Sequence, residues 1–185
     1  MKRLVQRLVP SIGTRSLLIG AHCCLLHPWF VALGWWKLYG FPRDPRLWIA
    51  FVVHDWGYWG LPDMDGALGQ QHPELGGRIM RRLFGTAWGD FTRLHSRYYA
   101  QLEGRAVSPL CAADKLATTL VPARLYLSMV RVSGELEEYL ALAWRADFYM
   151  GNDPQEWFAL LCEHWRTLAA EQAASVRCTG APIHP

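Results

Sequence analysis

The amino-acid sequence predicts an all-α protein. Helical periodicity recurs along its 185 residues, proline and glycine mark where helices begin and end, and alternating strand patterns with hairpin turns are hard to find. Hydrophobic residues make up 51% of the chain and charged residues 19%, enough apolar material to bury a core without disulfides. We therefore expect a single helical domain over residues 1–185.

Four helices are expected in the first part of the chain, and the fourth of them is strongly apolar. Helical patterns cover Lys2–Val9, Ser16–Leu26 and Pro28–Tyr39, the last of which begins at a proline and ends before a glycine. Pro45 begins a further helix that is apolar on all sides, which predicts that it is buried. A histidine and an aspartate stand at the end of this buried helix.

The segment Gly57–Gln71 is rich in glycine and is predicted to be an irregular loop. Beyond it we expect further helices, each bounded by proline, glycine or a polar cap: Pro73–Phe84, Trp88–Gln101, Leu110–Leu120, Gly134–Tyr149 and Asp153–Ala174. The tail Arg177–Pro185 is expected to be frayed.

Charge and cysteine content exclude several classes of protein. The net charge is +3 and the basic residues are scattered, except for Arg78, Arg81 and Arg82, which fit a solvated helix face, so we expect no nucleic-acid partner. The five cysteines are odd in number and lack CxxC spacing, which argues against a disulfide framework or a zinc ribbon. These features are typical of a cytoplasmic protein.

One uncharged segment, Ser16–Trp36, is long enough to cross a bilayer. Two histidines and a proline would then lie near the middle of the membrane, where such groups are costly, and no cleavable signal precedes them. We expect a buried helix instead. The basic start of the chain (Lys2, Arg3 and Arg7) leaves open a peripheral contact with a membrane surface.

The adjacent pair His54 and Asp55 ends the buried apolar helix, where ionisable groups need a partner or a metal ion. One histidine lies 27 residues before His54, two follow 18 and 41 residues after it, and an aspartate follows after 60 residues: His27, His72, His95 and Asp114. Imidazole and carboxylate ligands together suit iron, manganese or zinc. The ordered set therefore predicts a metal site, with His22 as an alternative to His27.

With these residues the chain resembles the HD-domain superfamily of metal-dependent phosphohydrolases and related di-iron oxygenases. The resemblance covers about residues 15–122 and rests on five runs: Leu26-His27-Pro28, Val53-His54-Asp55-Trp56-Gly57, His72-Pro73-Glu74-Leu75-Gly76, Leu94-His95-Ser96 and Ala112-Ala113-Asp114-Lys115. It implies an HD-type helical bundle. The helices expected over residues 123–176 lie outside the resemblance and could cap a pocket or form a dimer face.

The resemblance also implies how the ligands divide. One metal ion would be held by His27, His54, Asp55 and Asp114, and a second by His72 and His95, with Asp55 bridging the two. Members with one metal usually lack the two middle histidines, so two divalent ions per chain are expected. Iron or manganese is favoured, with zinc or magnesium as alternatives.

The leading functional hypothesis is a phosphohydrolase that acts on a nucleotide or another small phosphorylated, and therefore anionic, metabolite. Its expected catalytic and substrate-facing residues are Asp55, Lys115, Arg97 and Tyr58. Many hydrolytic members have a lysine where this chain has Tyr58. An HD-type di-iron oxygenase that cleaves a C–C or C–P bond and a non-catalytic metal-binding module are the alternatives, and the oligomeric state is left open.

Neighbouring residues are weaker candidates. Tyr98 is expected near the pocket mouth, and Asp63 and Asp65 could serve as a general base or simply form turns. His164 and His184 lie outside the ligand pattern and are expected to be structural or surface residues. Six of the ten tryptophans cluster at positions 29–59, which suggests a rigid aromatic pocket wall near the ligands.

Overall fold

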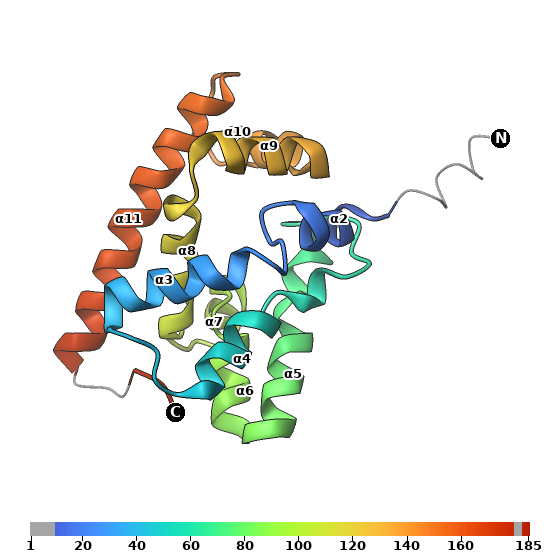
Figure 1. The fold of residues 1–185 in the computed structure, drawn as a ribbon. Coiled ribbons are helices and arrows are strands. Elements are labelled where there is room, and N and C mark those ends of the chain that lie inside the picture. The colour runs from blue at the N-terminus through green and yellow to red at the C-terminus, as the bar shows by residue number, and fades with distance from the viewer. Residues whose placement is uncertain (1–9, 180–182) are drawn as a thin grey trace.

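The structure is a computed structural model that describes residues 10–179 and 183–185. Within these residues the regular elements are all helical, which confirms the all-α prediction (Figure 1). The elements are α2 (Ile12–Ile19), α3 (His27–Tyr39), α4 (Pro45–Val53), η1 (Trp56–Tyr58), η2 (Gly69–Gln71), α5 (Pro73–Phe84), α6 (Thr86–Arg93), α7 (Arg97–Leu102), α8 (Pro109–Leu120), α9 (Ala123–Ser133), α10 (Glu135–Arg145) and α11 (Pro154–Thr179). The expected helix Lys2–Val9 lies outside the described residues.

Several helix boundaries follow local signals in the sequence. Helices α4, α5, α8 and α11 each begin at a proline, whose missing N–H would have no partner in the first turn anyway. Asp44 caps α4 by accepting a hydrogen bond from the Arg46 backbone N–H at 2.8 Å. Gly40 and Gly85, with φ of +89° and +91°, end α3 and α5 in a conformation that disfavours side chains.

The apolar run that resembled a membrane span is divided between two helices. Helix α2 begins at Ile12, four residues before the expected start, because the Ser11 hydroxyl accepts a hydrogen bond from the Thr14 N–H. It ends at Ile19, so the expected helix Ser16–Leu26 is wrong in its second half, where the chain turns before α3. In the described part of the chain no helix is both long and apolar enough to cross a membrane.

The expected single helix Trp88–Gln101 is also wrong, because the chain breaks between α6 and α7. Ser96 caps α7 by accepting a hydrogen bond from the Tyr99 N–H, which favours a new helix start over continuation. This break places His95 in a turn between the two helices rather than on a helix surface.

The C-terminal third differs from expectation in three further ways. Helix α9 was not expected, and α11 continues to Thr179, beyond the expected end at Ala174. The end of the chain packs against the protein rather than fraying, since the His184 ring lies 5.8 Å from the Trp88 ring and 6.5 Å from the Trp35 ring. Aromatic packing of this kind can hold a terminus that has no secondary structure.

The two larger apolar clusters hold most of the helices together. The larger lies between α3, α4, α5, α6 and α8 and includes Val31, Trp35, Phe51 and Met80. The second joins α9, α10 and α11, and α11 also packs along α8. Helices α3 and α8 lie in close contact, which brings residues near the start of α3 next to residues in the middle of α8.

Candidate metal centre

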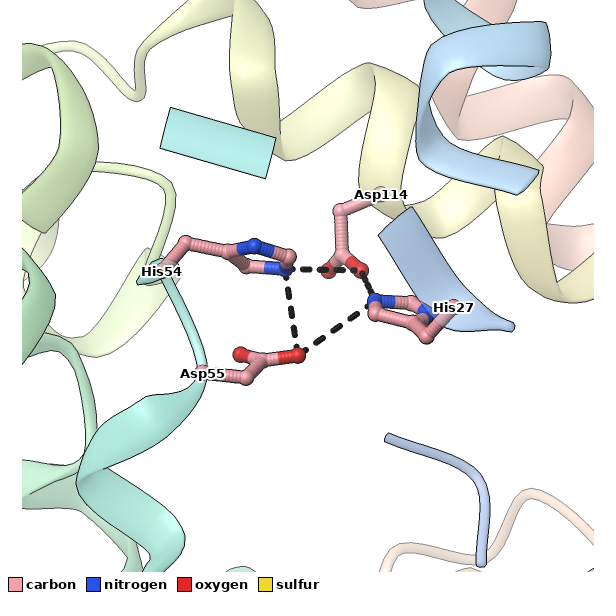
Figure 2. A group of neighbouring side chains, drawn as sticks. All are labelled: His27, His54, Asp55 and Asp114. Atoms are coloured by element: carbon pink, nitrogen blue, oxygen red, sulfur yellow. Dashed lines mark ion pairs between the residues drawn. The ribbon is translucent and has the colours of Figure 1, made fainter. Parts of the chain in front are cut away.

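Three helical segments bring the first four candidate ligands together (Figure 2). His27 begins α3, His54 and Asp55 follow α4, and Asp114 lies in α8. The His27 Nε2 atom is 3.0 Å from Asp114 Oδ1 and 3.3 Å from Asp55 Oδ2. The His54 Nε2 atom is 3.1 Å from Asp55 Oδ2 and 3.7 Å from Asp114 Oδ1. All four side chains are buried.

A second donor group lies on the other side of Asp55. The Nε2 atoms of His72 and His95 are 3.6 and 3.5 Å from Asp55 Oδ1, and they lie 3.3 Å from each other. Asp55 therefore directs its Oδ2 atom toward His27 and His54 and its Oδ1 atom toward His72 and His95. The six predicted ligands thus form two donor groups that share one carboxylate.

Backbone carbonyls orient three of the histidine rings. In each case the Nδ1 atom faces the carbonyl oxygen three residues earlier, where an Nδ1–H donates and leaves the Nε2 atom directed into the cluster. The pairs are His54 with Phe51 at 3.0 Å, His72 with Gly69 at 2.8 Å and His95 with Thr92 at 2.6 Å. Ring orientation is therefore set locally, before any metal ion binds.

The cluster has the properties expected of a metal site. The Nε2 atoms of His27 and His54 and the Oδ2 atom of Asp55 are buried and have no hydrogen-bond partner. Such atoms are costly in a protein interior unless something satisfies them. Since they point toward one another, a divalent cation between them fits the donor set of imidazoles and carboxylates.

Close backbone packing explains two glycines in the motif runs. A Cβ atom on Gly57 would overlap the His72 carbonyl oxygen, and one on Gly76 would lie 2.5 Å from the Val53 carbonyl oxygen. Glycine at both places lets the start of α5 pack directly on the turn that contains His54 and Asp55.

The electrostatics differ between the two groups. Burial alone would lower the pKa of His54, but the neighbouring Asp55 carboxylate raises it to about 10. Burial likewise opposes the charge on Asp55, yet His54 holds the pKa of that carboxyl well below its ordinary value. In the second group, burial outweighs the attraction of Asp55 and lowers the pKa of His72 to about 3.

A cavity of about 430 Å³ opens next to the first donor group. His27 and Asp114 line it, as do the candidate substrate-facing residues Tyr58, Arg97 and Lys115. The Lys115 Nζ atom lies 3.1 Å from Asp114 Oδ2 and 4.8 Å from the centre of the Trp165 ring. Burial would lower the pKa of Lys115, but Asp114 raises it, so the amine remains charged.

The weaker candidates fall in different places. Asp65 lines the cavity, whereas Asp63 accepts a hydrogen bond from the Gly69 N–H at 2.7 Å and stabilises the loop. Tyr98 was expected at the pocket mouth, but it is exposed on α7 and is not among the lining residues. His164 is exposed and lines the cavity, although the sequence assigned it no role there.

His22, the alternative to His27, lies beside the metal ligands rather than among them. Its Nδ1 atom is 2.8 Å from Ser16 Oγ and 3.5 Å from Glu135 Oε1, and its ring meets the His27 ring edge-on at 5.6 Å. It belongs to neither donor group.

Glu135 was not singled out by sequence pattern, although it is fully buried beside the cavity. It accepts hydrogen bonds from Ser16 Oγ at 2.7 Å, the Ala21 N–H at 2.9 Å and the Tyr139 hydroxyl at 2.8 Å. A glutamate in the first turn of an amphipathic helix is common on protein surfaces, so no sequence pattern distinguishes it.

The aromatic wall of the cavity comes from a different part of the chain than expected. Of the clustered tryptophans, Trp29, Trp36 and Trp59 are exposed, Trp35 is in the core, and none lines the cavity. Aromatic residues of the C-terminal third take that place: Tyr126, Tyr139, Phe148, Trp157 and Trp165. The helices beyond residue 122 therefore cover the cavity next to the donor groups.

Compared with family models, with curated proteins and with solved structures, the chain matched none. The resemblance to the HD-domain superfamily thus rests on the motif residues alone.

Proposed function

We propose that this protein is a metal-dependent phosphohydrolase that uses two divalent cations to hydrolyse a small phosphate ester. The observation that supports this best is the position of Asp55, whose two carboxylate oxygens each face a separate donor group. Paired metal ions a few ångströms apart are typical of enzymes that displace phosphate esters. A bridging carboxylate is the simplest way to hold two such ions.

His27, His54, Asp55 and Asp114 would hold one ion, and Asp55, His72 and His95 the other. When bound there, divalent ions supply Lewis acidity, which activates water as a nucleophile and neutralises charge on the phosphate. The donor groups contain three to four protein ligands each, which leaves coordination positions for water and substrate.

Two positively charged side chains near the first donor group suit an anionic substrate. Lys115 is held between Asp114 and Trp165, and Arg97 lies at the start of α7 with its side chain lining the same cavity. Among the described residues Arg97 has no ion-pair partner, so it is available to bind phosphate oxygens bidentately. Both residues would stabilise the negative charge that a phosphate group carries through the reaction.

Tyr58 and the C-terminal aromatic residues would bind the rest of the substrate. Burial and the nearby Asp55 carboxylate raise the pKa of Tyr58 well above its ordinary value, so the phenol stays protonated and can donate a hydrogen bond. Tyr126, Trp157 and Trp165 give the same cavity an apolar wall. Such a wall excludes water and favours an ester with an apolar or flat organic part.

A di-iron oxygenase is the second candidate, and one observation favours it. Tyr58 stands where many hydrolytic HD proteins have a lysine, and its ring stacks on His72 at 4.1 Å with an angle of 10° between the planes. An aromatic ring at this position provides no charge for phosphate. The same donor set would suit iron and a C–C or C–P bond cleavage that consumes oxygen.

The metal content of purified protein tests the proposal most directly. We expect about two manganese or iron equivalents per chain, falling to about one in His72→Ala with His95→Ala, because the second donor group is then lost. His164→Ala is the matched control, since this histidine lines the cavity outside both groups. Elemental analysis measures the content, and release of p-nitrophenol from bis(p-nitrophenyl) phosphate and p-nitrophenyl phosphate measures hydrolysis.

The outcomes separate the candidates. Hydrolysis that requires both donor groups supports the phosphohydrolase. Iron-dependent oxygen consumption without hydrolysis would favour the oxygenase instead. Protein that binds no metal after anaerobic reconstitution would contradict both and leave a non-catalytic domain.

A further inference from the structure

An exposed aromatic face lies on the outer side of α3 and on the turn after it. Trp29, Leu33 and Trp36 are 63%, 43% and 55% exposed, and their spacing of four and three residues places them on one side of the helix. Phe41 follows with 57% exposure. We call these four residues the exposed aromatic face. Large exposed apolar side chains that lie together usually mark a contact surface, whereas single exposed ones do not.

Ring contacts make the face continuous. Trp36 and Phe41 lie 5.8 Å apart between ring centres, Phe41 and Trp48 6.4 Å, and Trp48 and Trp29 5.8 Å. The opposite side of α3 is also apolar and is buried, with Val31 in the core. Helix α3 is therefore apolar on both sides, although the fold covers only one of them.

Two positively charged side chains lie next to the exposed aromatic face in the sequence. Lys37 follows Trp36, Arg43 lies two residues after Phe41, and both are exposed. Neither forms an ion pair with any residue in 10–179 or 183–185. No aspartate or glutamate occurs in the sequence before Asp44, and Asp44 is paired with Arg46 at 2.7 Å.

We propose that the exposed aromatic face binds the surface of an anionic lipid bilayer. Tryptophan favours the boundary between headgroups and acyl chains, where its ring is apolar and its N–H stays hydrated. Lys37 and Arg43 would lie at the level of the lipid phosphates and be attracted to them. An amphipathic, monotopic contact of this kind needs no helix that crosses the membrane.

A second copy of the chain fits this face less well. A two-fold contact would place the face against itself and bring Lys37 and Arg43 of both copies together. Since the face has no carboxylate of its own to pair with them, these charges would repel one another. A negatively charged bilayer provides the missing complement.

Vesicle sedimentation with the full chain tests the inference and needs neither turnover nor metal, so its result is independent of the proposed hydrolase. The probes are vesicles of phosphatidylcholine alone and vesicles with about one-third phosphatidylglycerol, enough to give a negative surface potential. We expect binding to the anionic vesicles, weakened about tenfold by Trp29→Ala with Trp36→Ala. The matched control is Val132→Ala with Trp144→Ala, which removes exposed apolar side chains from α9 and α10.

A charge variant and an assembly measurement complete the test. Lys37→Gln with Arg43→Gln should weaken binding to anionic vesicles and remove its dependence on salt. Circular dichroism checks that all variants keep the fold, as their side chains are exposed. No binding to anionic vesicles, or equal losses in the tryptophan and control variants, would overturn the inference. A dimer in analytical ultracentrifugation that Trp29→Ala with Trp36→Ala dissociates would assign the face to a second copy and also overturn it.

Discussion

His54 and His72 lie on opposite sides of Asp55 and differ in how they meet a metal ion. The Asp55 carboxylate raises the pKa of His54 to about 10 against the effect of burial, whereas burial lowers the pKa of His72 to about 3. At neutral pH the metal-free protein therefore holds an extra proton on His54 and none on His72. A metal ion must displace the first proton to bind, but it finds His72 already neutral.

We predict that metal affinity rises with pH from 6.5 to 8.5. Each proton displaced from the first donor group contributes a factor of about ten per pH unit, since binding and proton release are linked. Manganese titration by calorimetry at several pH values measures the slope. His72→Ala with His95→Ala should keep the slope, because the pKa values of His27 and His54, both in the first donor group, are the raised ones. An affinity that is independent of pH would contradict this assignment.

Metal affinity is expected to rise with pH, but the stability of the metal-free protein should fall, because the proton on His54 stabilises the fold. Because the folded pKa of His54 lies above the ordinary value of 6.5, its proton stabilises the fold fully below pH 6.5. That contribution is lost as pH rises toward about 10. Protein treated with a chelator should therefore unfold at lower temperatures as the pH is raised through this range, more steeply than the metal-loaded protein.

At the scale of elements, the contact between α3 and α8 determines whether the first donor group forms. His27 begins α3 and Asp114 lies within α8, so their distance depends on how closely the two helices approach. Gly34 permits that approach, because a Cβ atom there would lie 2.5 Å from the Ala113 carbonyl oxygen. The carbonyl belongs to a helix backbone and cannot move aside alone.

We predict that Gly34→Ala lowers the free energy of unfolding by about 2 kcal/mol, the usual cost of overpacking, despite the better helix propensity of alanine. It should also reduce metal content, because α3 must move away from α8. Urea denaturation and elemental analysis measure the two effects. Leu33→Ala on the exposed side of α3 is the control and should change stability by less than about 0.5 kcal/mol. An unchanged or raised stability in Gly34→Ala would show that the helices are not held this closely.

Helix boundaries could be predicted where they are marked by a single residue type in the sequence, such as proline. Prolines at 45, 73 and 154 begin helices as expected, since a proline at the first helical position costs no hydrogen bond. The break before α7 was not predicted, because the apolar periodicity of residues 88–101 continues across it. Ser96 can cap a helix or lie within one, and its neighbours in the fold decide between the two.

At the scale of the molecule, Glu135 joins the beginning of the described chain to its C-terminal third. Its carboxylate binds Ser16, Ala21 and Tyr139, residues of α2, of the turn after it and of α10. This contact closes the C-terminal helices over the cavity beside the donor groups. Its loss would leave several buried polar groups without an acceptor.

We predict that Glu135→Ala lowers the free energy of unfolding by about 3 kcal/mol, because the buried donors lose their shared acceptor. Glu135→Gln should recover part of this loss, since one amide oxygen can still accept from Ser16 or Tyr139. Glu137→Ala, an exposed change in the same helical turn, is the control. Chemical denaturation gives the three values. Equal stabilities for Glu135→Ala and Glu137→Ala would mean that the hydrogen bonds of Glu135 do not contribute to the free energy of unfolding.

Local patterns in the sequence were enough to predict the helical class, most helix starts and the order of the six candidate ligands. These depend on residue type and on spacing along the chain, which act over a few residues. Three features could be seen only in the folded protein: Asp55 faces two donor groups, His22 lies against Glu135 rather than among the ligands, and C-terminal aromatic residues line the cavity. Such contacts join residues as far apart as Ser16 and Glu135, whose separation of 119 positions leaves no periodic trace in the sequence. Their formation depends on how whole helices pack, because burial energy is shared among many side chains and is not assigned to any one pair.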